Sequence, residues 1–205
     1  MPRLASCAAA IAIGLAIACT AALSNHAAKG PTIDEDIDAE IAKDNAIIWA
    51  QRRPLAWADF TGPPPADVGA VAAQTNYALL HGTGCTGSKF EFRVVAAFVP
   101  GKSWVRTSML RSAAESARAL RHEQTHFDIT EVHARRLRRY YAELMAPCRI
   151  ASGDLAAAAS RIGRDEKAAQ AQYDAETDNG RTAAQQARWD RDIAAQLVTL
   201  AKFAR

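Results

Sequence analysis

The chain has 205 residues, of which 25 are basic and 22 are acidic, and its formal net charge is +3. Because the charges nearly balance, the composition gives no reason to expect a polyanionic partner such as nucleic acid. The length beyond a short N-terminal segment fits one domain with its own core, since domains cluster near ~100–200 residues.

The first residues have the three parts of an export signal. Arg3 supplies the charged start, an apolar run of mostly small residues follows at 8–22, and a polar break comes at 24–26. We therefore expect residues 1–24 to be a signal segment and the mature protein to be secreted or periplasmic. An alternative is a lipid anchor through Cys19, because the residues that precede it loosely resemble a lipoprotein box.

Residues 25–45 are polar, so we expect a flexible N-terminal segment there, followed by a single domain over residues 46–205. At 89–99, apolar Phe90, Phe92 and Val94 alternate with charged side chains before a continuous apolar run, and we also interpret 71–80 and, less strongly, 55–60 as strands. Such alternation predicts strands, and the two stronger ones are expected to pair as an antiparallel hairpin.

Between these two strands, residues 82–87 match the dinucleotide-binding pattern G-x-G-x-x-G. That pattern needs a following helix whose N-terminus holds the pyrophosphate, and here a strand follows. We interpret the glycines as a loop that requires positive backbone angles, and we expect no nucleotide to bind.

A long helix is predicted at 107–145, because apolar residues recur there mostly at spacings of three, four or seven. In its middle, residues 122–126 spell H-E-x-x-H. Residues four apart on a helix lie one turn above each other, so His122 and His126 can bind one zinc ion while Glu123 reaches a water on the same metal. Zinc polarises a carbonyl and lowers the pKa of its water toward ~7, and the glutamate takes the proton.

This chemistry predicts an exported zinc-dependent metallohydrolase that acts on a peptide or protein substrate, with Glu123 as the catalytic residue. His133 lies roughly 10 Å further along the helix at ~1.5 Å per residue, so we expect it to be a supporting or surface residue and not a ligand. The arginines at 135–139 are expected on a solvated face and not in a nucleic-acid site. Without metal, the same motif would be an ordinary helix that carries two histidines.

Two cysteines remain outside the signal segment. Cys7 and Cys19 fall inside it, whereas Cys85 and Cys148 belong to the mature chain. An even pair in an exported protein predicts one disulfide bond.

The alanine-rich C-terminal third is expected to form two helices, at 154–176 and 182–204, joined by a turn whose glycine ends the first helix. Strands early and helices late predict an α+β fold. In this fold a small antiparallel sheet packs on the long H-E-x-x-H helix, and a C-terminal helical pair follows.

Four groups of residues between positions 55 and 193 carry a family resemblance. They are Leu55-x-Trp57-x-Asp59-Phe60-x-Gly62, Ser103-Trp104-Val105, the stretch from Leu120 to Glu131 around the motif, and Tyr173-Asp174-x-x-Thr177-x-x-Gly180 followed by Trp189. These residues resemble a bacterial domain family of uncharacterised proteins that is described as predicted secreted zinc-dependent proteases, with a zincin-like fold. The resemblance implies that His122 and His126 are zinc ligands and that Glu123 is the general base.

The third zinc ligand is open at this stage. Many members of the family place a histidine directly before the glycine of the last group, where this chain has Asn179. The candidates are then Asp174 or Asp178 near that turn, or Glu131 on the motif helix. Glu131 is turned ~140° from His126, so a carboxylate from the later helices is favoured, and we take Asp174 as the third ligand.

Two further expectations concern the surroundings of the histidines. Asp128 and Glu131 are expected to orient the imidazoles by accepting their second N–H. With only two strong ligands the zinc would bind weakly, so the alternative function is a catalytically silent envelope binding or scaffold protein with a degenerate metal site.

Overall fold

The computed structural model describes residues 31–67, 69 and 71–204. The expected signal segment at 1–24, including Cys19 as the alternative lipid anchor, lies outside the described residues. None of the helices described is long and apolar enough to cross a membrane.

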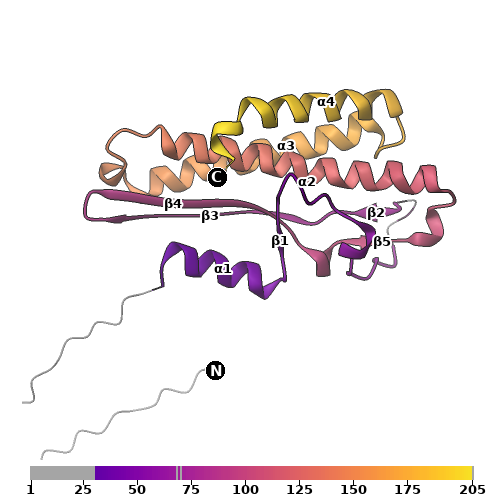
Figure 1. Cartoon of the computed structure of the whole chain (residues 1–205), viewed down its shortest axis with the longest axis horizontal. Coiled ribbons are helices and arrows are strands. Elements are labelled where there is room, and N and C mark those ends of the chain that lie inside the picture. The colour runs from indigo at the N-terminus through magenta and orange to yellow at the C-terminus, as the bar shows by residue number, and fades with distance from the viewer. Residues whose placement is uncertain (1–30, 68, 70, 205) are drawn as a thin grey trace, which may run out of the picture. The chain divides into compact units, whose positions relative to one another are not determined.

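An antiparallel hairpin is confirmed and forms the main sheet, but its first strand runs over residues 77–86 and not over the predicted 71–80. Its two strands pair from Tyr77 with Phe98 to Thr86 with Lys89, and a short third strand joins the end of the second. A separate two-stranded sheet lies near it (Figure 1). The strands are β1 (Ile47–Ile48), β2 (Ala73–Gln74), β3 (Tyr77–Thr86), β4 (Lys89–Phe98) and β5 (Trp104–Val105).

The strand predicted at 55–60 was wrong. Residues Trp57–Asp59 form a 3-10 turn instead. The carboxylate of Asp59 accepts a hydrogen bond from the backbone N–H of Ala56 at 2.8 Å and also pairs with Arg53. This local capping bends the chain where the alternation of side chains suggested an extended backbone.

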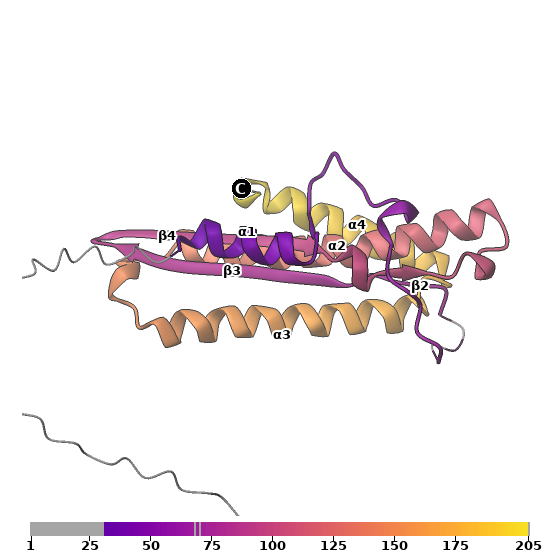
Figure 2. The ribbon, with the colours of Figure 1, turned by 90° about the horizontal axis from the view of Figure 1, so that it is seen from below.

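Helices cover both faces of the hairpin, which gives the expected mixed α+β architecture. α2 packs on β3 and β4, with α3 and α4 packed on α2, while α1 lies against the opposite face of the same two strands (Figures 1 and 2). The helices are α1 (Ile33–Lys43), α2 (Ala113–Ala142), α3 (Ser152–Thr177) and α4 (Ala183–Thr199). α2 is shorter than predicted, because the Ser112 side chain caps its first turn by accepting from the Glu115 N–H.

The segment expected to be flexible, at 25–45, contains α1. The side chain of Thr32 and that of Glu35 each accept the other residue's backbone N–H, which forms a capping box at the start of this helix. Ile37 is buried against the sheet. The compact unit therefore begins at Pro31, before the expected boundary at residue 46.

The glycines of the G-x-G-x-x-G pattern explain how α1 packs. Gly82 and Gly84 belong to β3 and not to a loop, so that expectation was wrong, and only Gly87 has a positive φ, of 62°. A Cβ atom at Gly82 would lie 2.7 Å from Cγ2 of Ile33, and one at Gly84 would lie 3.2 Å from its Cδ1. The missing side chains make room for Ile33.

The arginines that follow the motif were expected on a solvated face, and two of them are buried. Arg135 and Arg138 both pair with the carboxylate of Glu131, with closest contacts of 2.8 and 3.0 Å. Because α2 is covered by the sheet on one side and by two helices on the other, its middle has no broad solvated face. His133 is also buried, and its Nδ1 donates to the carbonyl of Ile129 at 2.9 Å.

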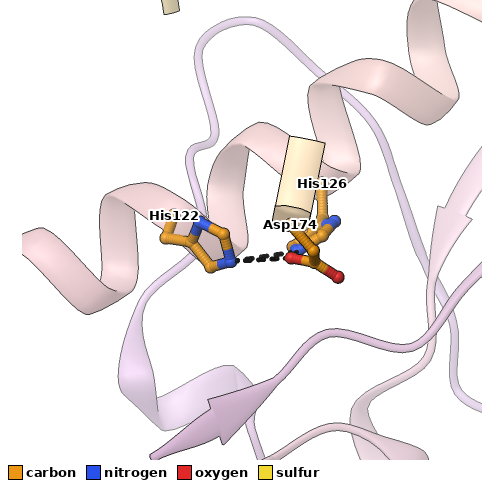
Figure 3. A group of neighbouring side chains, drawn as sticks. All are labelled: His122, His126 and Asp174. Atoms are coloured by element: carbon orange, nitrogen blue, oxygen red, sulfur yellow. Dashed lines mark hydrogen bonds and ion pairs between the residues drawn. The ribbon is translucent and has the colours of Figure 1, made fainter. Parts of the chain in front are cut away.

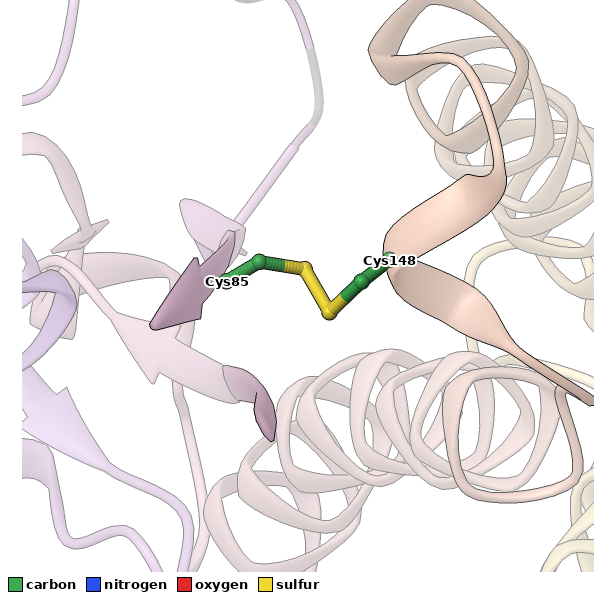
Figure 4. The surroundings of a disulfide bond; sticks show 2 residues. All are labelled: Cys85 and Cys148. Atoms are coloured by element: carbon green, nitrogen blue, oxygen red, sulfur yellow. A yellow bond between two sulfur atoms is a disulfide. The ribbon is translucent and has the colours of Figure 1, made fainter. Parts of the chain in front are cut away.

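The predicted disulfide bond is confirmed between Cys85 and Cys148 (Figure 4), whose Cα atoms lie 5.9 Å apart. Cys85 lies near the tip of the hairpin, and Cys148 lies in the 3-10 turn Pro147–Arg149 that follows α2. The bond therefore ties the far end of the sheet to the connection between α2 and α3. A disulfide of this kind is compatible with an exported protein.

We predict that Gly82→Ala lowers the free energy of unfolding by about 1–3 kcal/mol, because the added methyl group collides with the branched side chain of Ile33. Urea unfolding followed by circular dichroism measures this change. The control is Gly163→Ala in α3, where a Cβ meets nothing within 4 Å and should raise stability by about 0.5–1 kcal/mol. Equal effects of the two variants would contradict the packing of α1 described above.

Candidate metal centre

The two histidines of the motif face the same space between α2 and α3. They stand one turn apart on α2, and both are buried. Their ring centroids lie 4.7 Å apart, and the two Nε2 atoms are separated by 3.2 Å. The helix geometry alone brings these two nitrogens together, as the spacing of the motif predicts.

Asp174 on α3 completes a group of three (Figure 3). Its Oδ1 lies 3.1 Å from Nε2 of His122 and 3.0 Å from Nε2 of His126. A tetrahedral zinc ion with bonds of ~2.0–2.1 Å holds its ligand atoms about 3.3 Å apart. The separations of the three atoms in this group are close to that value, so these residues fit the zinc ion that the motif implies.

The other two candidates for a third ligand lie elsewhere. Asp178 is exposed and pairs with Arg181 at 3.2 Å. Glu131 is buried among the arginines of α2 and faces away from the histidines. Among the described residues, only His122, His126 and Asp174 form a group of three potential metal ligands.

The imidazoles are oriented by amides and not by Asp128 and Glu131, so that expectation was wrong. Nδ1 of His122 lies 3.2 Å from Oε1 of Gln186, and Nδ1 of His126 lies 2.6 Å from Oε1 of Gln170. Asp128 instead accepts from the indole N–H of Trp49 at 2.7 Å and from the side chain of Gln124.

Each of these amides is itself held in one orientation. The Nε2 group of Gln170 donates to the carbonyl of His126 at 2.9 Å. Gln186 donates from Nε2 to Asp190 at 2.7 Å, and its Oε1 accepts from the Tyr173 hydroxyl at 2.7 Å. The amide oxygens must therefore face the rings, so both Nδ1 atoms carry a proton.

With Nδ1 protonated, each neutral ring has its lone pair on Nε2. Two nitrogen lone pairs and a carboxylate oxygen then converge on one point, and all three are acceptors. Such an arrangement is stable only with positive charge among them, supplied by a metal ion or by a proton. A metal ion satisfies all three acceptors at once, whereas one proton satisfies two.

The pKa values of Asp174 and His126 are shifted by the same interaction between carboxylate and imidazole. Burial acts to raise the pKa of Asp174, but hydrogen bonds and charge from the two histidines hold it well below its usual range. Burial acts to lower the pKa of His126, but its hydrogen bond to Asp174 and the negative charges of Glu123 and Asp174 raise it.

Glu123 lies beside this group in an open cleft of about 440 Å³. Its Oε2 accepts a hydrogen bond from the backbone N–H of Thr75 at 2.7 Å, directly after β2. No described residue bonds to its Oε1. The cleft is lined by β2 and the start of β3 on one side and by α2, α3 and the turn after α3 on the other.

That turn packs closely on the site. Asp178, Asn179 and Gly180 all have positive φ, and the Thr177 hydroxyl accepts from the Gly180 N–H at 3.2 Å. A Cβ at Gly180 would lie 2.9 Å from Cγ of His122, so glycine is required for this approach. Asn179 lines the cleft, at the position where a histidine was expected in the family pattern.

Sequence reasoning missed four residues at the site. Thr75 bonds to Glu123, Gln170 and Gln186 bond to the two histidines, and Tyr77 lines the same cleft, yet none of the four was singled out. The spacing of Gln170 and Asp174, four apart on a helix, was a usable signal, because it places both on the face of α3 that carries the proposed ligand.

Comparison with known proteins gives one family. Neither a curated protein nor a solved structure matches the chain. A family model described as a bacterial protein of unknown function, DUF922, matches residues 56–182, which is more than half of the chain. The matched region includes the motif, Asp174 and the turn that packs on His122. The chain therefore belongs to the bacterial family of unknown function DUF922.

Proposed function

We propose that this protein is an exported zinc-dependent hydrolase that cleaves peptide bonds. One observation carries the proposal: two imidazole lone pairs and a carboxylate converge at the wall of an open cleft, and a glutamate with one free oxygen stands beside them. Zinc with three protein ligands and an open position is the common catalytic form of the metal.

The donor atoms support zinc as the metal in this proposal. Two imidazole nitrogens with one carboxylate oxygen suit zinc, whereas magnesium and calcium prefer sites made of oxygen atoms alone. The charge also balances, because a divalent cation would neutralise the carboxylates of Asp174 and Glu123. When bound, zinc would polarise the scissile carbonyl and acidify a water molecule.

In this proposal Glu123 moves the proton. The water oxygen bonds to the carbonyl carbon, the proton of the water passes to Oε1 of Glu123, and the C–N bond breaks as that proton is transferred to the leaving amine. The N–H of Thr75 holds Oε2 at 2.7 Å, so the carboxylate has a fixed orientation with Oε1 available.

A second candidate is a binding or scaffold protein of the cell envelope that has lost catalysis. It is favoured by Asn179, which offers only a weak amide ligand in the cleft where the family pattern has a histidine. The two candidates differ in metal content. The enzyme requires near-stoichiometric zinc in protein purified without added metal, and the scaffold does not.

For the mechanism, we expect Glu123→Gln to retain zinc and lose hydrolysis by at least about 100-fold, because the amide cannot accept the proton. His122→Ala should lose both zinc and activity, because one ligand is removed. Peptide cleavage assays and metal analysis on the same samples measure the two effects. Undiminished cleavage of a peptide by Glu123→Gln would refute the role of this residue.

For the third ligand, we expect Asp174→Ala to weaken zinc binding strongly, because it removes one of three donor atoms. Asp178→Ala is the matched control, since this carboxylate lies four residues away and pairs with Arg181 at the surface. Elemental analysis of both variants and of the parent gives the zinc content per molecule. A parent protein that is folded but empty would favour the scaffold. Zinc loss in the Asp178 variant alone would show that the ligand is misassigned.

For the amides, we expect Gln170→Leu to weaken zinc binding by about 10- to 100-fold, because Nδ1 of His126 loses the acceptor that orients the ring. The control is Gln172→Leu, on the exposed side of the same helix, where the amide bonds only to Glu176. Competition with a chromophoric chelator measures the affinities. The orienting role would be rejected by equal affinities in the two variants.

A further inference from the structure

Tyr77 lies across the cleft from the group formed by His122, His126 and Asp174. It is the first residue of β3, and it lines the same cleft as His122, Glu123 and Asp174. Side chains two apart on an extended chain point to the same side. Leu79 packs against the core shared with α2, so the ring of Tyr77 is directed toward α2 as well.

The hydroxyl group of Tyr77 has no hydrogen-bond partner among the described residues, although the side chain is half-buried. Tyr173 differs in this respect, because its hydroxyl donates to Gln186 at 2.7 Å behind the ring of His122. A free donor at the wall of a cleft is thus available to a molecule that enters the cleft.

The electrostatic environment keeps this hydroxyl protonated. Burial, followed by the negative charges of Glu166 and Asp174, raises the pKa of Tyr77 to about 12. At neutral pH the group is therefore a donor and not an anion. The effect of Asp174 also indicates that the hydroxyl and the ligand group share one electrostatic environment.

We propose that the hydroxyl of Tyr77 donates a hydrogen bond to the oxygen of the scissile carbonyl as that oxygen gains negative charge. This role rests on the proposed hydrolytic function. When water adds to the carbonyl carbon, the electron pair of the C=O bond moves to the oxygen, and a donor fixed in advance stabilises it. Removal of one such donor typically costs ~10²–10³ in kcat.

The two arginines that line the cleft are less suited to this role. Arg181 already pairs with Asp178. Arg118 lines the cleft on α2, but it is exposed to solvent, where a charge contributes little. Tyr77 combines partial burial, a free hydroxyl and a place on the wall opposite the motif helix.

The first measurement compares Tyr77→Phe with the parent in peptide hydrolysis. We expect kcat to fall by about 100-fold, with KM and zinc affinity changed less than about threefold, because the ring and its packing are retained. The control is Tyr140→Phe, which removes a hydroxyl from a tyrosine of α2 that packs on the core away from the cleft. An unchanged kcat in Tyr77→Phe, on a peptide that the parent cleaves, overturns the proposal.

The second measurement does not depend on catalysis. Inorganic phosphate is a tetrahedral oxyanion, and its binding to the zinc-loaded parent, Tyr77→Phe and Arg118→Gln can be followed by calorimetry. We expect Tyr77→Phe to raise the dissociation constant by about tenfold, and Arg118→Gln to raise it less, because exposed charges are screened. If the variants change phosphate affinity in this way but the parent cleaves no peptide, the donor role of Tyr77 is supported and peptide hydrolysis is rejected. The role of Tyr77 is overturned if the parent does not bind phosphate or if Tyr77→Phe binds it as tightly as the parent does. It is also overturned if Arg118→Gln weakens phosphate binding more than Tyr77→Phe does.

Discussion

Three hydrogen-bond acceptors face one another at the boundary of α2 and α3, and the packing of the two helices holds them in this position. His122, His126 and Asp174 repel one another unless positive charge lies between them. The surrounding structure opposes that repulsion. Tyr173 is fully buried and stacks on the ring of His122 at 4.7 Å, and Gln170 joins α3 to the backbone of α2. Local unfavourable contacts of this kind are typical of functional sites.

A second group of charged residues is buried further along α2. The carboxylate of Glu131 is 1% exposed and pairs with Arg135 and Arg138. The same guanidinium groups donate to backbone carbonyls of β4, α4 and the final 3-10 turn, at Val94, Leu197 and Phe203. Breaking a buried pair leaves an uncompensated charge, which is strongly destabilising. One helix thus carries the two histidines of the candidate site and also joins the sheet to the C-terminal helices.

The sequence predicted the motif helix and the hairpin from local spacing, and the disulfide from the even pair of cysteines. The predictions from the sequence were wrong where the burial of a residue depends on which other elements pack over it. Periodicity shows which residues share a face of α2, but not that a sheet and two helices together cover most faces, so the burial of Arg135 was unforeseen. The packing of α1 on Gly82 and the reach of Gln186 to His122 are contacts between distant segments, and no local pattern encodes them.

The position of Gln186 has a practical consequence for work on the family. The region matched by the family model covers residues 56–182. The amide of Gln186, which orients His122, lies on α4 after the end of this region, and α1 lies before its start. A shortened protein cut at the family limits would keep His122, His126 and Asp174 but lose the amide of Gln186 that orients the ring of His122. Fragments for crystallography or metal titration should therefore extend from Pro31 through the last turn at Ala201–Phe203.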